Sequence, residues 1–280
     1  MESKKIWLVT GASKGFGLEI VKAILDHGDK VIATVRKPSE LLSGLARKNA
    51  DLYIADMDVT NEAQVKAAVN AAVKHFGGID ILVNNAGYGI VGAIEEISDN
   101  EVKKQYDTNV FGLLNVTRAV LPFMRDQKSG YIINVSSLYA FDVIPGWALY
   151  GSTKFAVDGI SKGLAKELEP FGIKVTAIEP GLFRTEFLSK ESFVIAEQPI
   201  AAYSDTFAGQ MRMGSGSFHG QQLGDPEKLA QIIIRLSGLT SPPLHLPIGP
   251  DAVENYTLNA DNMAAIVAEW RDVSSGTNHD

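Results

Sequence analysis

Short apolar runs and longer helical patterns alternate along residues 5–180. Strands are predicted over 5–10, 31–35, 52–55, 79–83, 131–135 and 174–178, and helices over 15–27, 62–76, 98–125 and 148–168. Because strands that alternate with helices build parallel β-α-β units with right-handed crossovers, this order favours the α/β class. The strands are apolar throughout, which is typical of a sheet covered by helices on both faces. We therefore expect a doubly wound fold whose ligands bind at the carboxyl ends of the strands.

The regular alternation stops after Gly181. Residues 186–224 contain scattered apolar positions and the run MRMGSGSFHGQQLG, which favours a mobile lid or substrate loop, with a plain surface insertion as the alternative. Helices are then predicted over 225–236 and about 251–271, with a last strand over 244–248. No linker or repeat divides the chain. We expect one domain over 1–280, with a cofactor-binding and catalytic core (1–185), the lid or loop (186–224) and C-terminal elements (225–280).

Charge and cysteine content exclude several classes of function. The 280 residues carry 26 Lys and Arg against 33 Asp and Glu, a formal net charge of −7, so the chain lacks the basic surplus that binds nucleic acid. It has no cysteine, which excludes disulfides, thiolate catalysis and Cys metal sites, and its five histidines show no metal-ligand spacing. No apolar run is long enough for a signal peptide or a membrane span. We expect a cytoplasmic protein without a metal, nucleic acid or membrane partner.

A glycine-rich loop, Gly11-Ala12-Ser13-Lys14-Gly15-Phe16-Gly17, joins the first predicted strand to the first predicted helix. Glycines permit a tight turn and a close approach of the backbone to a pyrophosphate, and a helix N-terminus supplies free N–H groups and a positive dipole. The GxxxGxG spacing differs from the GxGxxG of other dinucleotide folds. A turn that starts the helix without binding a ligand is the alternative. The position directly after the first strand favours dinucleotide binding.

The end of the second predicted strand bears on the choice between NAD and NADP. Dinucleotide folds that select NAD commonly place an acid there for the ribose 2′-hydroxyl, whereas this chain reads Ala33-Thr34-Val35-Arg36-Lys37. Arg36 lies where a 2′-phosphate would lie, and a guanidinium matches phosphate with a bidentate fork. Lys14 of the glycine loop can approach the same phosphate. We therefore expect NADP(H), and the alternative is that both cations are solvated surface charges.

Tyr150 and Lys154 form a YxxxK pattern on the helix predicted over 148–168. Positions i and i+4 share a helix face, so the ammonium and the phenol can be neighbours. A nearby cation would lower the pKa of Tyr150 from its ordinary value of about 10, which would make the phenol a usable acid or base near neutral pH. Ser137 lies just past the fifth predicted strand and can hydrogen-bond a carbonyl oxygen. Ser136 is its rival for that role.

Together these motifs resemble the short-chain dehydrogenase/reductase family. The resemblance rests on the glycine loop after Thr10, Asn84-Asn85-Ala86-Gly87, Ser137, the Tyr150/Lys154 pair and Pro180-Gly181, in the family's order and spacing. It covers about residues 5–185, and residues 244–249 resemble the family's final strand. Small departures are Phe16, where the family often has Ile or Leu, and Gly151 and Thr153 within the usual YxASK. The resemblance implies a single-domain Rossmann fold around a seven-stranded parallel sheet.

The resemblance also implies a role for each matching residue. Tyr150 would be the catalytic acid or base, and Lys154 would bind the nicotinamide ribose and tune Tyr150. Ser137 would orient the substrate carbonyl, and Asn109 would help to hold a proton-relay water. Cofactor contacts are expected from Gly11, Ser13, Lys14, Gly15, Phe16, Gly17, Arg36, Asp58, Val59, Asn85, Ala86, Gly87, Tyr150, Lys154, Pro180, Gly181, Phe183 and Thr185.

The substrate pocket is expected around the loop after Ser137. Its predicted lining is Tyr88, Tyr139, Phe141, Ile144, Trp147 and Phe187. Such a lining favours an apolar or aromatic ketone or aldehyde, while Arg184 and Arg212 leave an anionic substrate open. We expect an NADP(H)-dependent oxidoreductase, an alcohol dehydrogenase or carbonyl reductase that forms a homodimer or homotetramer through the long helices after the fourth and fifth strands. A catalytically weak NADP-binding sensor or scaffold is the alternative.

Overall fold

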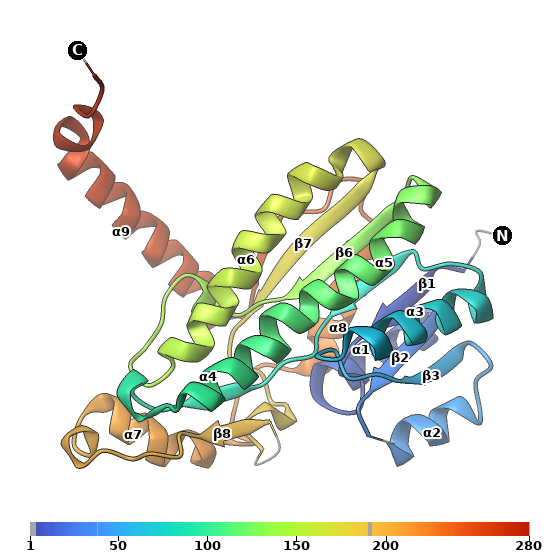
Figure 1. Cartoon of the computed structure of the whole chain (residues 1–280), viewed down its shortest axis with the longest axis horizontal. Helices are drawn as coiled ribbons and strands as arrows, with labels where there is room; N and C mark the ends of the chain where they lie inside the picture. Colours follow the sequence, from blue (N-terminus) through green and yellow to red (C-terminus); the bar gives the residue numbers. More distant parts are fainter. Residues whose placement is uncertain (1–3, 38, 190–191, 280) are drawn as a thin grey trace.

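The main sheet has seven strands in the computed structural model, which describes residues 4–37, 39–189 and 192–279 (Figure 1). They are β1 (Ile6–Val9), β2 (Lys30–Val35), β3 (Leu52–Asp56), β4 (Ile81–Asn84), β6 (Gly130–Val135), β7 (Ile173–Pro180) and β9 (His245–Ile248). Their order is β3-β2-β1-β4-β6-β7-β9, and neighbouring strands run parallel. The chain winds outward from β1 first through β2 and β3, and then returns to β4 and winds the other way. The predicted doubly wound, seven-stranded parallel sheet is confirmed.

The strands are apolar because both faces of the sheet are covered. Trp7, Leu8 and Val9 of β1 are all fully buried, although successive side chains of a strand point to opposite faces. β1 lies in the middle of the sheet, where Val9 is paired with Ala33 of β2 on one side and Val83 of β4 on the other. A strand with a buried side chain at each position reads as an unbroken apolar run, which is the pattern that the sequence shows.

Helices pack on both faces of the sheet (Figure 1). The α-helices in the described part of the chain are α1 (Gly15–His27), α2 (Glu40–Ala46), α3 (Glu62–Phe76), α4 (Asp99–Tyr106), α5 (Leu113–Gln127), α6 (Ala148–Leu168), α7 (Phe207–Gly214), α8 (Pro226–Ser237) and α9 (Pro250–Ser275). On one face α1, α2 and α8 contribute Leu18, Leu42 and Ile233 to the core. On the other face α3 and α5 contribute Val69 and Val120, and α6 packs beside them. The strand ends are thus held between two helical layers.

The region 98–125 differs from the single helix that the sequence predicts. It consists of α4, a π-helical turn η2 (Asp107–Gly112) and α5 in direct succession. A Cβ on Gly112 would lie 2.6 Å from Cγ2 of Val59, so the π-turn passes close to the connection after β3. A π-turn adds one residue to a helical turn and is frequent at functional sites. Asn109 lies in this turn.

The segment 186–224 contains regular elements, in contrast to the loop that its composition favours. Its described elements are η5 (Glu186–Leu188), β8 (Phe193–Ile195), η6 (Ala201–Tyr203), α7 and η7 (Ser215–Phe218), whereas residues 190–191 lie outside the described part of the chain. β8 pairs in parallel with β5 (Gly89–Val91) to form a separate two-stranded sheet. Because β5 lies shortly after β4, this small sheet brings the segment to the carboxyl edge of the main sheet.

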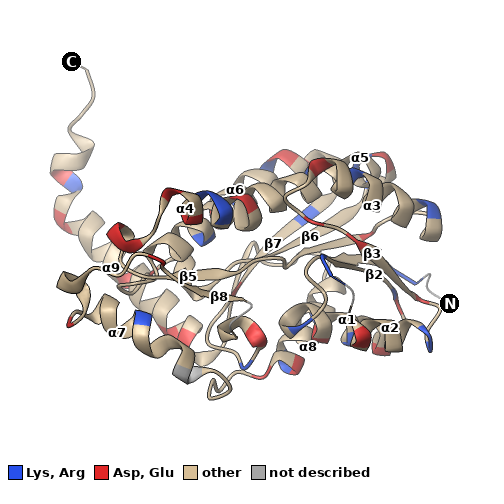
Figure 2. Cartoon of the chain, turned by 60° about the horizontal axis from the view of Figure 1, so that its bottom comes forward, with Lys and Arg blue, Asp and Glu red and all other residues tan. Residues whose placement is uncertain are grey.

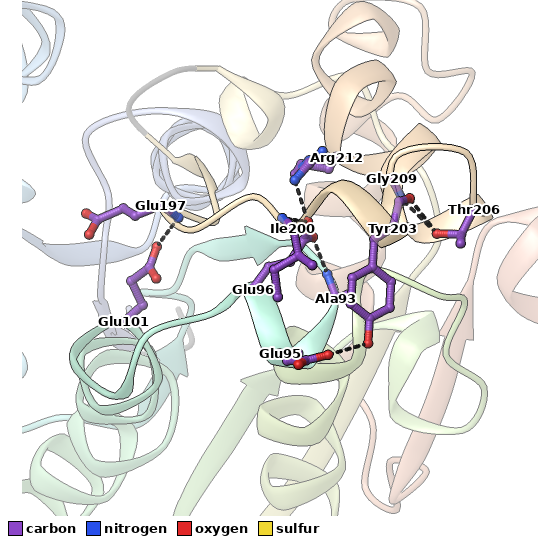
Figure 3. A network of polar contacts seen from close by, with 10 residues as sticks. All are labelled: Ala93, Glu95, Glu96, Glu101, Glu197, Ile200, Tyr203, Thr206, Gly209 and Arg212. Carbon is purple, nitrogen blue, oxygen red and sulfur yellow. Dashed lines mark hydrogen bonds and ion pairs between the residues drawn. The ribbon is translucent and has the colours of Figure 1, made fainter.

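A buried ion pair holds the segment 186–224 against the chain that follows β5 (Figure 3). Glu96 is fully buried and forms an ion pair with Arg212 of α7. It also accepts hydrogen bonds from the backbone N–H groups of Ala93 (3.0 Å) and Ile200 (2.9 Å). Nearby, Glu101 accepts a hydrogen bond from the N–H of Glu197 (3.2 Å). The carboxylates of Glu96 and Glu101 therefore hold the backbone of the segment 186–224 at Ile200 and at Glu197.

The helix α9 leaves the body of the protein after its first turns and projects away from it (Figures 1 and 2). Its start is fixed, because the carboxylate of Asp251 accepts a hydrogen bond from the N–H of Leu182 (2.6 Å) and Ala252 is fully buried. Each described residue from 260 to 279 is exposed. Among the helices in the described part of the chain, none has the length and apolarity needed to cross a membrane.

Candidate active site

The segments after β1 and β4 are joined by hydrogen bonds at the carboxyl edge of the sheet. Thr10 Oγ1 accepts hydrogen bonds from the N–H groups of Asn85 (2.9 Å) and Ala86 (3.0 Å). In return, Asn85 Nδ2 donates to the carbonyl oxygens of Thr10 (2.8 Å) and Gly11 (3.2 Å). The glycine loop and the Asn85–Gly87 segment therefore form one unit, as their positions after neighbouring strands predict.

The glycine loop has the backbone that a pyrophosphate cradle needs. Gly11 and Gly15 have φ angles of +65° and +56°, a region that favours glycine. A Cβ on Gly17 would lie 2.4 Å from the carbonyl oxygen of Gly11, so a side chain has no room there. α1 begins at Gly15, and the first N–H groups of a helix stay outside its own hydrogen bonds and attract anions. These features fit a dinucleotide phosphate.

The structure places Arg36 next to this cradle. The carbonyl oxygen of Thr34 at the end of β2 accepts a hydrogen bond from the N–H of Ala12 (3.0 Å), so the loop and the strand end are in contact. Arg36 follows two residues later and is exposed. Asp58 and Val59, predicted beside the adenine, follow β3, the strand that neighbours β2. Asp58 is already engaged in a turn, since its Oδ1 accepts hydrogen bonds from the N–H (2.9 Å) and hydroxyl (2.8 Å) of Thr60.

Tyr150, Ser137 and Lys154 lie together beyond the ends of β6 and β7. Tyr150 and Lys154 are buried on the first two turns of α6, with Lys154 Nζ 5.5 Å from the centroid of the Tyr150 ring. Lys154 Nζ donates a hydrogen bond to the carbonyl oxygen of Val135 (2.8 Å), next to Ser136 and Ser137. The Tyr150 side chain is hydrogen-bonded to Ser137. The structure thus brings the three predicted catalytic side chains into one group.

The predicted lowering of the pKa of Tyr150 is wrong, because both partners are buried. Burial raises the pKa of the Tyr150 phenol, and the hydrogen bond with Ser137 offsets only part of that rise. Burial also lowers the pKa of Lys154 to about 8, while the charge of Asp158 acts in the opposite direction. The ammonium lies over the ring face and donates to the main chain, so burial of the phenol is the stronger effect. The phenol of Tyr150 is therefore protonated at neutral pH.

The side chain of Asn109 is held by hydrogen bonds to the backbone of Tyr88. Asn109 Oδ1 accepts from the N–H of Tyr88 (3.1 Å), and Asn109 Nδ2 donates to the carbonyl oxygen of Tyr88 (3.0 Å) and to Thr153 Oγ1 (3.0 Å). A Cβ on Gly87 would lie 3.2 Å from Asn109 Oδ1 and 3.9 Å from Lys154 Nζ. Gly87, Asn109 and Lys154 therefore lie close together.

The segment after β7 closes the other side of this edge. Pro180 ends β7, and the N–H of Gly181 donates to the carbonyl oxygen of Ile248 in β9 (2.9 Å). Phe183 is buried, with its ring 5.4 Å from that of Phe16 in an edge-to-face arrangement. A Cβ on Gly15 would lie 3.5 Å from Cβ of Thr185, so this segment also meets the glycine loop.

Four of the six predicted pocket residues gather around Tyr150. Tyr139, Trp147 and Phe187 have ring centroids 6.2, 5.6 and 5.4 Å from that of Tyr150, and Ile144 packs in the same cluster. The other two lie elsewhere. Phe141 packs against Tyr256 of α9 (4.8 Å), and Tyr88 packs in a neighbouring cluster with Ile90 and Leu149. The sequence could not show which of the six residues lie next to Tyr150, because the direction of each side chain depends on tertiary contacts.

A buried polar cluster behind the catalytic group escapes sequence analysis. Ser136 Oγ donates to Asp158 Oδ1 (2.6 Å), and His245 Nδ1 lies 2.6 Å from Glu179 Oε1 and 3.5 Å from Asp158 Oδ2. Burial raises the pKa of both carboxyls. The residues come from the position directly after β6 and from α6, β7 and β9, so no local pattern joins them. The available signals were the position of Asp158 one turn after Lys154 and that of Glu179 directly before Pro180.

Replacing Asp158 with Asn should lower the pKa of Lys154 below about 8, because the charge of Asp158 is what raises it. The substitution keeps an oxygen that accepts from Ser136. An NMR titration of 13C-labelled lysine side chains, with the Lys154 signal assigned from Lys154→Arg, measures the shift. Glu167→Gln removes an exposed charge from the same helix and should leave the pKa of Lys154 unchanged. Equal Lys154 titrations in wild type and Asp158→Asn would contradict this coupling.

Comparison with known proteins agrees with this fold. A family model described as short chain dehydrogenase matches residues 5–193, and the chain belongs to that family. Oxidoreductase BOA17 of Botryotinia fuckeliana (strain B05.10) is 40% identical over 272 residues, which cover 96% of this chain and 98% of the relative. The crystal structure of a short-chain dehydrogenase from Streptomyces avermitilis has a TM-score of 0.91 and 38% identity, and the match covers 99% of this chain and 100% of that one.

Two further solved relatives contain nicotinamide nucleotides. The closed form of serine dehydrogenase complexed with NADP+ is 33% identical, with a TM-score of 0.74 and coverage of 88% of this chain and 94% of that one. The 3-ketoacyl-(acyl-carrier-protein) reductase from Brucella melitensis complexed with NADH is 28% identical, with a TM-score of 0.73 and coverage of 87% and 96%. The family and these neighbours support an oxidoreductase with a nicotinamide cofactor. Because the two relatives hold different nucleotides, the choice between them depends on this chain's own residues.

Proposed function

We propose that the protein is an NADP(H)-dependent carbonyl reductase or alcohol dehydrogenase acting on apolar or aromatic ketones, aldehydes or secondary alcohols. The observation that carries the proposal is the environment of Tyr150. Its phenol is buried, hydrogen-bonded to Ser137, and surrounded by the rings of Tyr139, Trp147 and Phe187. A protonated phenol among apolar walls suits the transfer of a proton to the oxygen of an apolar carbonyl compound. The proposed setting is the cytoplasm, and the proposed assembly is a homodimer or homotetramer.

The residues of the carboxyl edge would hold the cofactor. The glycine loop and the start of α1 would bind the pyrophosphate, and Asn85–Gly87 would lie beside the adenosine ribose. Asp58 and Val59 would contact the adenine, and the segment 180–185 would hold the nicotinamide amide. When bound, the cofactor supplies the hydride donor or acceptor. The protein supplies alignment and the proton.

Each catalytic side chain has one task in the proposed reduction. Tyr150 donates its phenolic proton to the carbonyl oxygen, while the hydroxyl of Ser137 stabilises the negative charge that develops there. Lys154 then replaces the proton, and a water near Asn109 connects the site to solvent. Because burial raises the pKa of Tyr150, the phenol is in its proton-donating form at neutral pH, which favours the direction of carbonyl reduction.

The segment 186–224 would cover the substrate. Phe187 near its start contacts the Tyr150 ring, and Met211 of α7 packs in the same cluster. The ion pair of Glu96 with Arg212 would keep this cover in place (Figure 3). Arg212 is buried in this pair, which favours a structural role for it over binding of an anionic substrate.

Replacing Arg36 with Glu should weaken NADPH binding and leave NADH binding nearly unchanged. Hydrogen bonds to charged groups contribute about 1.5–3 kcal/mol, so the Kd for NADPH should rise roughly 10–100-fold. Fluorescence titration of both nucleotides measures the ratio. Arg125→Glu makes the same charge change at the last turn of α5 and should leave both Kd values within a few-fold. A wild-type protein that prefers NADH would contradict the proposed role of Arg36.

The test of the proposed activity is oxidation of NADPH and NADH against a panel of ketones and aldehydes, followed by the reverse assay with alcohols. We expect NADPH-dependent turnover of bulky apolar carbonyl compounds. Turnover of charged metabolites alone would contradict the proposed pocket. Tight NADPH binding without turnover in either direction would favour a sensor or scaffold.

A further inference from the structure

The projecting part of α9 carries an apolar stripe with the spacing of a coiled coil. Val253, Tyr256, Ala260, Met263, Val267 and Trp270 follow one another at alternating intervals of three and four residues. This is the a and d pattern of a heptad repeat, which places these side chains along one line of the helix. Ile266 and Val273 flank the line. We call these eight residues the α9 seam.

The α9 seam is exposed to solvent along its length. Trp270 is 54% exposed, Met263 52%, Val267 55% and Val273 68%. Near its start the helix contacts the body, where Tyr256 packs on Phe141, and its described residues from 260 onward are exposed. An exposed apolar line of this length is costly in water and marks a surface that binds another macromolecule.

The charges of α9 after its first turn lie away from the seam. Glu254 and Asp261 occupy b positions of the heptad, Glu269 a c position and Asp272 an f position, whereas Arg271 is at e. Figure 2 shows the helix as mostly uncharged, with a few charged bands. Two copies of the helix could therefore meet along the seam without bringing carboxylates face to face. A lipid surface is a poorer occupant, because four of these five charges are acidic and anionic lipids would repel them.

The size of the seam matches what a pair of chains needs. The helix has 26 residues, a length of about 39 Å. A specific interface buries about 1,200–2,000 Å² in total. To reach about 1,200 Å², each of the seven large seam side chains of a helix must hide roughly 85 Å², which is about half of what an aromatic side chain buries. The estimate counts α9 alone, and contacts between the two bodies would add to it.

We propose that the α9 seam pairs antiparallel with the α9 seam of a second copy of this chain. Pro250, where the helix joins the body, would then lie at opposite ends of the pair, so the two bodies would not compete for the same space. Met263 is at the middle of the helix. Because a positions pack beside d positions in an antiparallel pair, Met263 would lie beside Ala260 of the partner subunit and close to Met263 of the partner subunit at the two-fold axis. Val253 would lie opposite Trp270 of the partner subunit. The proposal does not depend on the proposed reaction.

Disulfide cross-linking tests the pairing, because the chain has no cysteine and each introduced one is unique. Met263→Cys should form disulfide-linked dimers under mild oxidation. Asp261→Cys places the thiol on a b position of the same helix turn and should stay largely unlinked. A mixture of Val253→Cys and Trp270→Cys chains should give the mixed dimer, with little linkage of either variant to itself. Absence of the Met263→Cys dimer, or equal linkage of Asp261→Cys, would overturn the proposal, and strong self-linkage of Trp270→Cys would overturn the antiparallel arrangement.

Light scattering on the full chain gives an independent measurement. Val267→Glu together with Met263→Glu should halve the molar mass relative to wild type, while Asp261→Lys with Asp272→Lys should leave it unchanged. All four positions are exposed in the single chain, so circular dichroism and NADPH binding should match wild type. A wild-type monomer, or a seam variant with the wild-type mass, would overturn the proposal. Binding of the seam to phosphatidylcholine vesicles in place of dimerisation would also overturn it.

Discussion

Tyr150→Phe should reduce turnover about 10²–10⁴-fold, the usual contribution of a positioned acid or base. The substitution removes the phenolic proton but keeps the ring that packs against Trp147 and Phe187. NADPH affinity should therefore stay within a few-fold of wild type. Steady-state kinetics with an active carbonyl compound and a fluorescence titration of NADPH measure the two quantities separately.

Tyr139→Phe is the matched control for this variant. Tyr139 belongs to the same aromatic cluster, with its ring edge-to-face to that of Tyr150 at 6.2 Å, and the substitution removes the same hydroxyl group. Its turnover should remain within about tenfold of wild type. If Tyr139→Phe lost as much activity as Tyr150→Phe, disturbance of the cluster would explain both results. Loss of NADPH binding in Tyr150→Phe would contradict a purely chemical role for the phenol.

Glu96→Gln should lower the free energy of unfolding by about 3 kcal/mol, which for a chain of this size lowers Tm by roughly 6–12 °C. The substitution leaves the Arg212 charge buried without its partner carboxylate. Removing one partner of a buried ion pair strongly lowers the stability of the fold. The segment 192–216 should also become more sensitive to proteases, because Glu96 holds the N–H of Ile200 as well. Thermal unfolding and limited proteolysis measure the two effects.

Glu95→Gln controls for the charge change at the neighbouring position. Glu95 is exposed and accepts a hydrogen bond from the hydroxyl of Tyr203 (2.9 Å), so its replacement should change stability by no more than about 0.5 kcal/mol. A Glu96→Gln protein as stable as Glu95→Gln would show that the buried pair contributes nothing net. Arg212→Gln combined with Glu96→Gln completes a double-mutant cycle that isolates the pair itself.

The stabilisation by Glu96 should also depend on pH. Burial alone would raise the pKa of Glu96, but the N–H groups of Ile200 and Ala93 and the charge of Arg212 outweigh burial and lower it. A carboxyl whose pKa is lower in the folded state stabilises the fold above its unfolded pKa, and that stabilisation is lost as pH falls through the folded value. The difference in stability between wild type and Glu96→Gln should therefore be largest near neutral pH and shrink below about pH 4.5.

The regular part of the fold is predictable because its signals are local. The helices over 15–27 and 148–168 have the predicted bounds, since apolar periodicity and flanking residues such as Gly28 mark them. The order of strands and helices was enough to predict the doubly wound sheet. The site was predictable for the same reason, because its motifs follow strand ends and strand ends of parallel sheets share one edge.

What the sequence did not reveal depends on contacts between distant residues. The cluster of Asp158, Glu179 and His245 is assembled from three elements, and the pairing of β5 with β8 joins residues about 100 positions apart. The pKa of Tyr150 was predicted in the wrong direction because burial is a tertiary property, whereas the spacing of Tyr150 and Lys154 indicates only proximity. The π-helical turn around Asn109 likewise has no signature in apolar periodicity.

The hydrogen bonds that Asn109 already makes determine the orientation of any water that binds to its side chain. A side-chain amide can donate twice and accept twice, and both donors of Asn109 are already used, by Tyr88 and Thr153. One of its two acceptor positions is taken by the N–H of Tyr88. A water at Asn109 must therefore point one of its hydrogens at Oδ1, which leaves its lone pairs directed toward donors such as the Lys154 ammonium. The π-turn thus fixes how a water held between Asn109 and Lys154 would be oriented: the Lys154 ammonium would donate to the water, and the water would donate to Asn109.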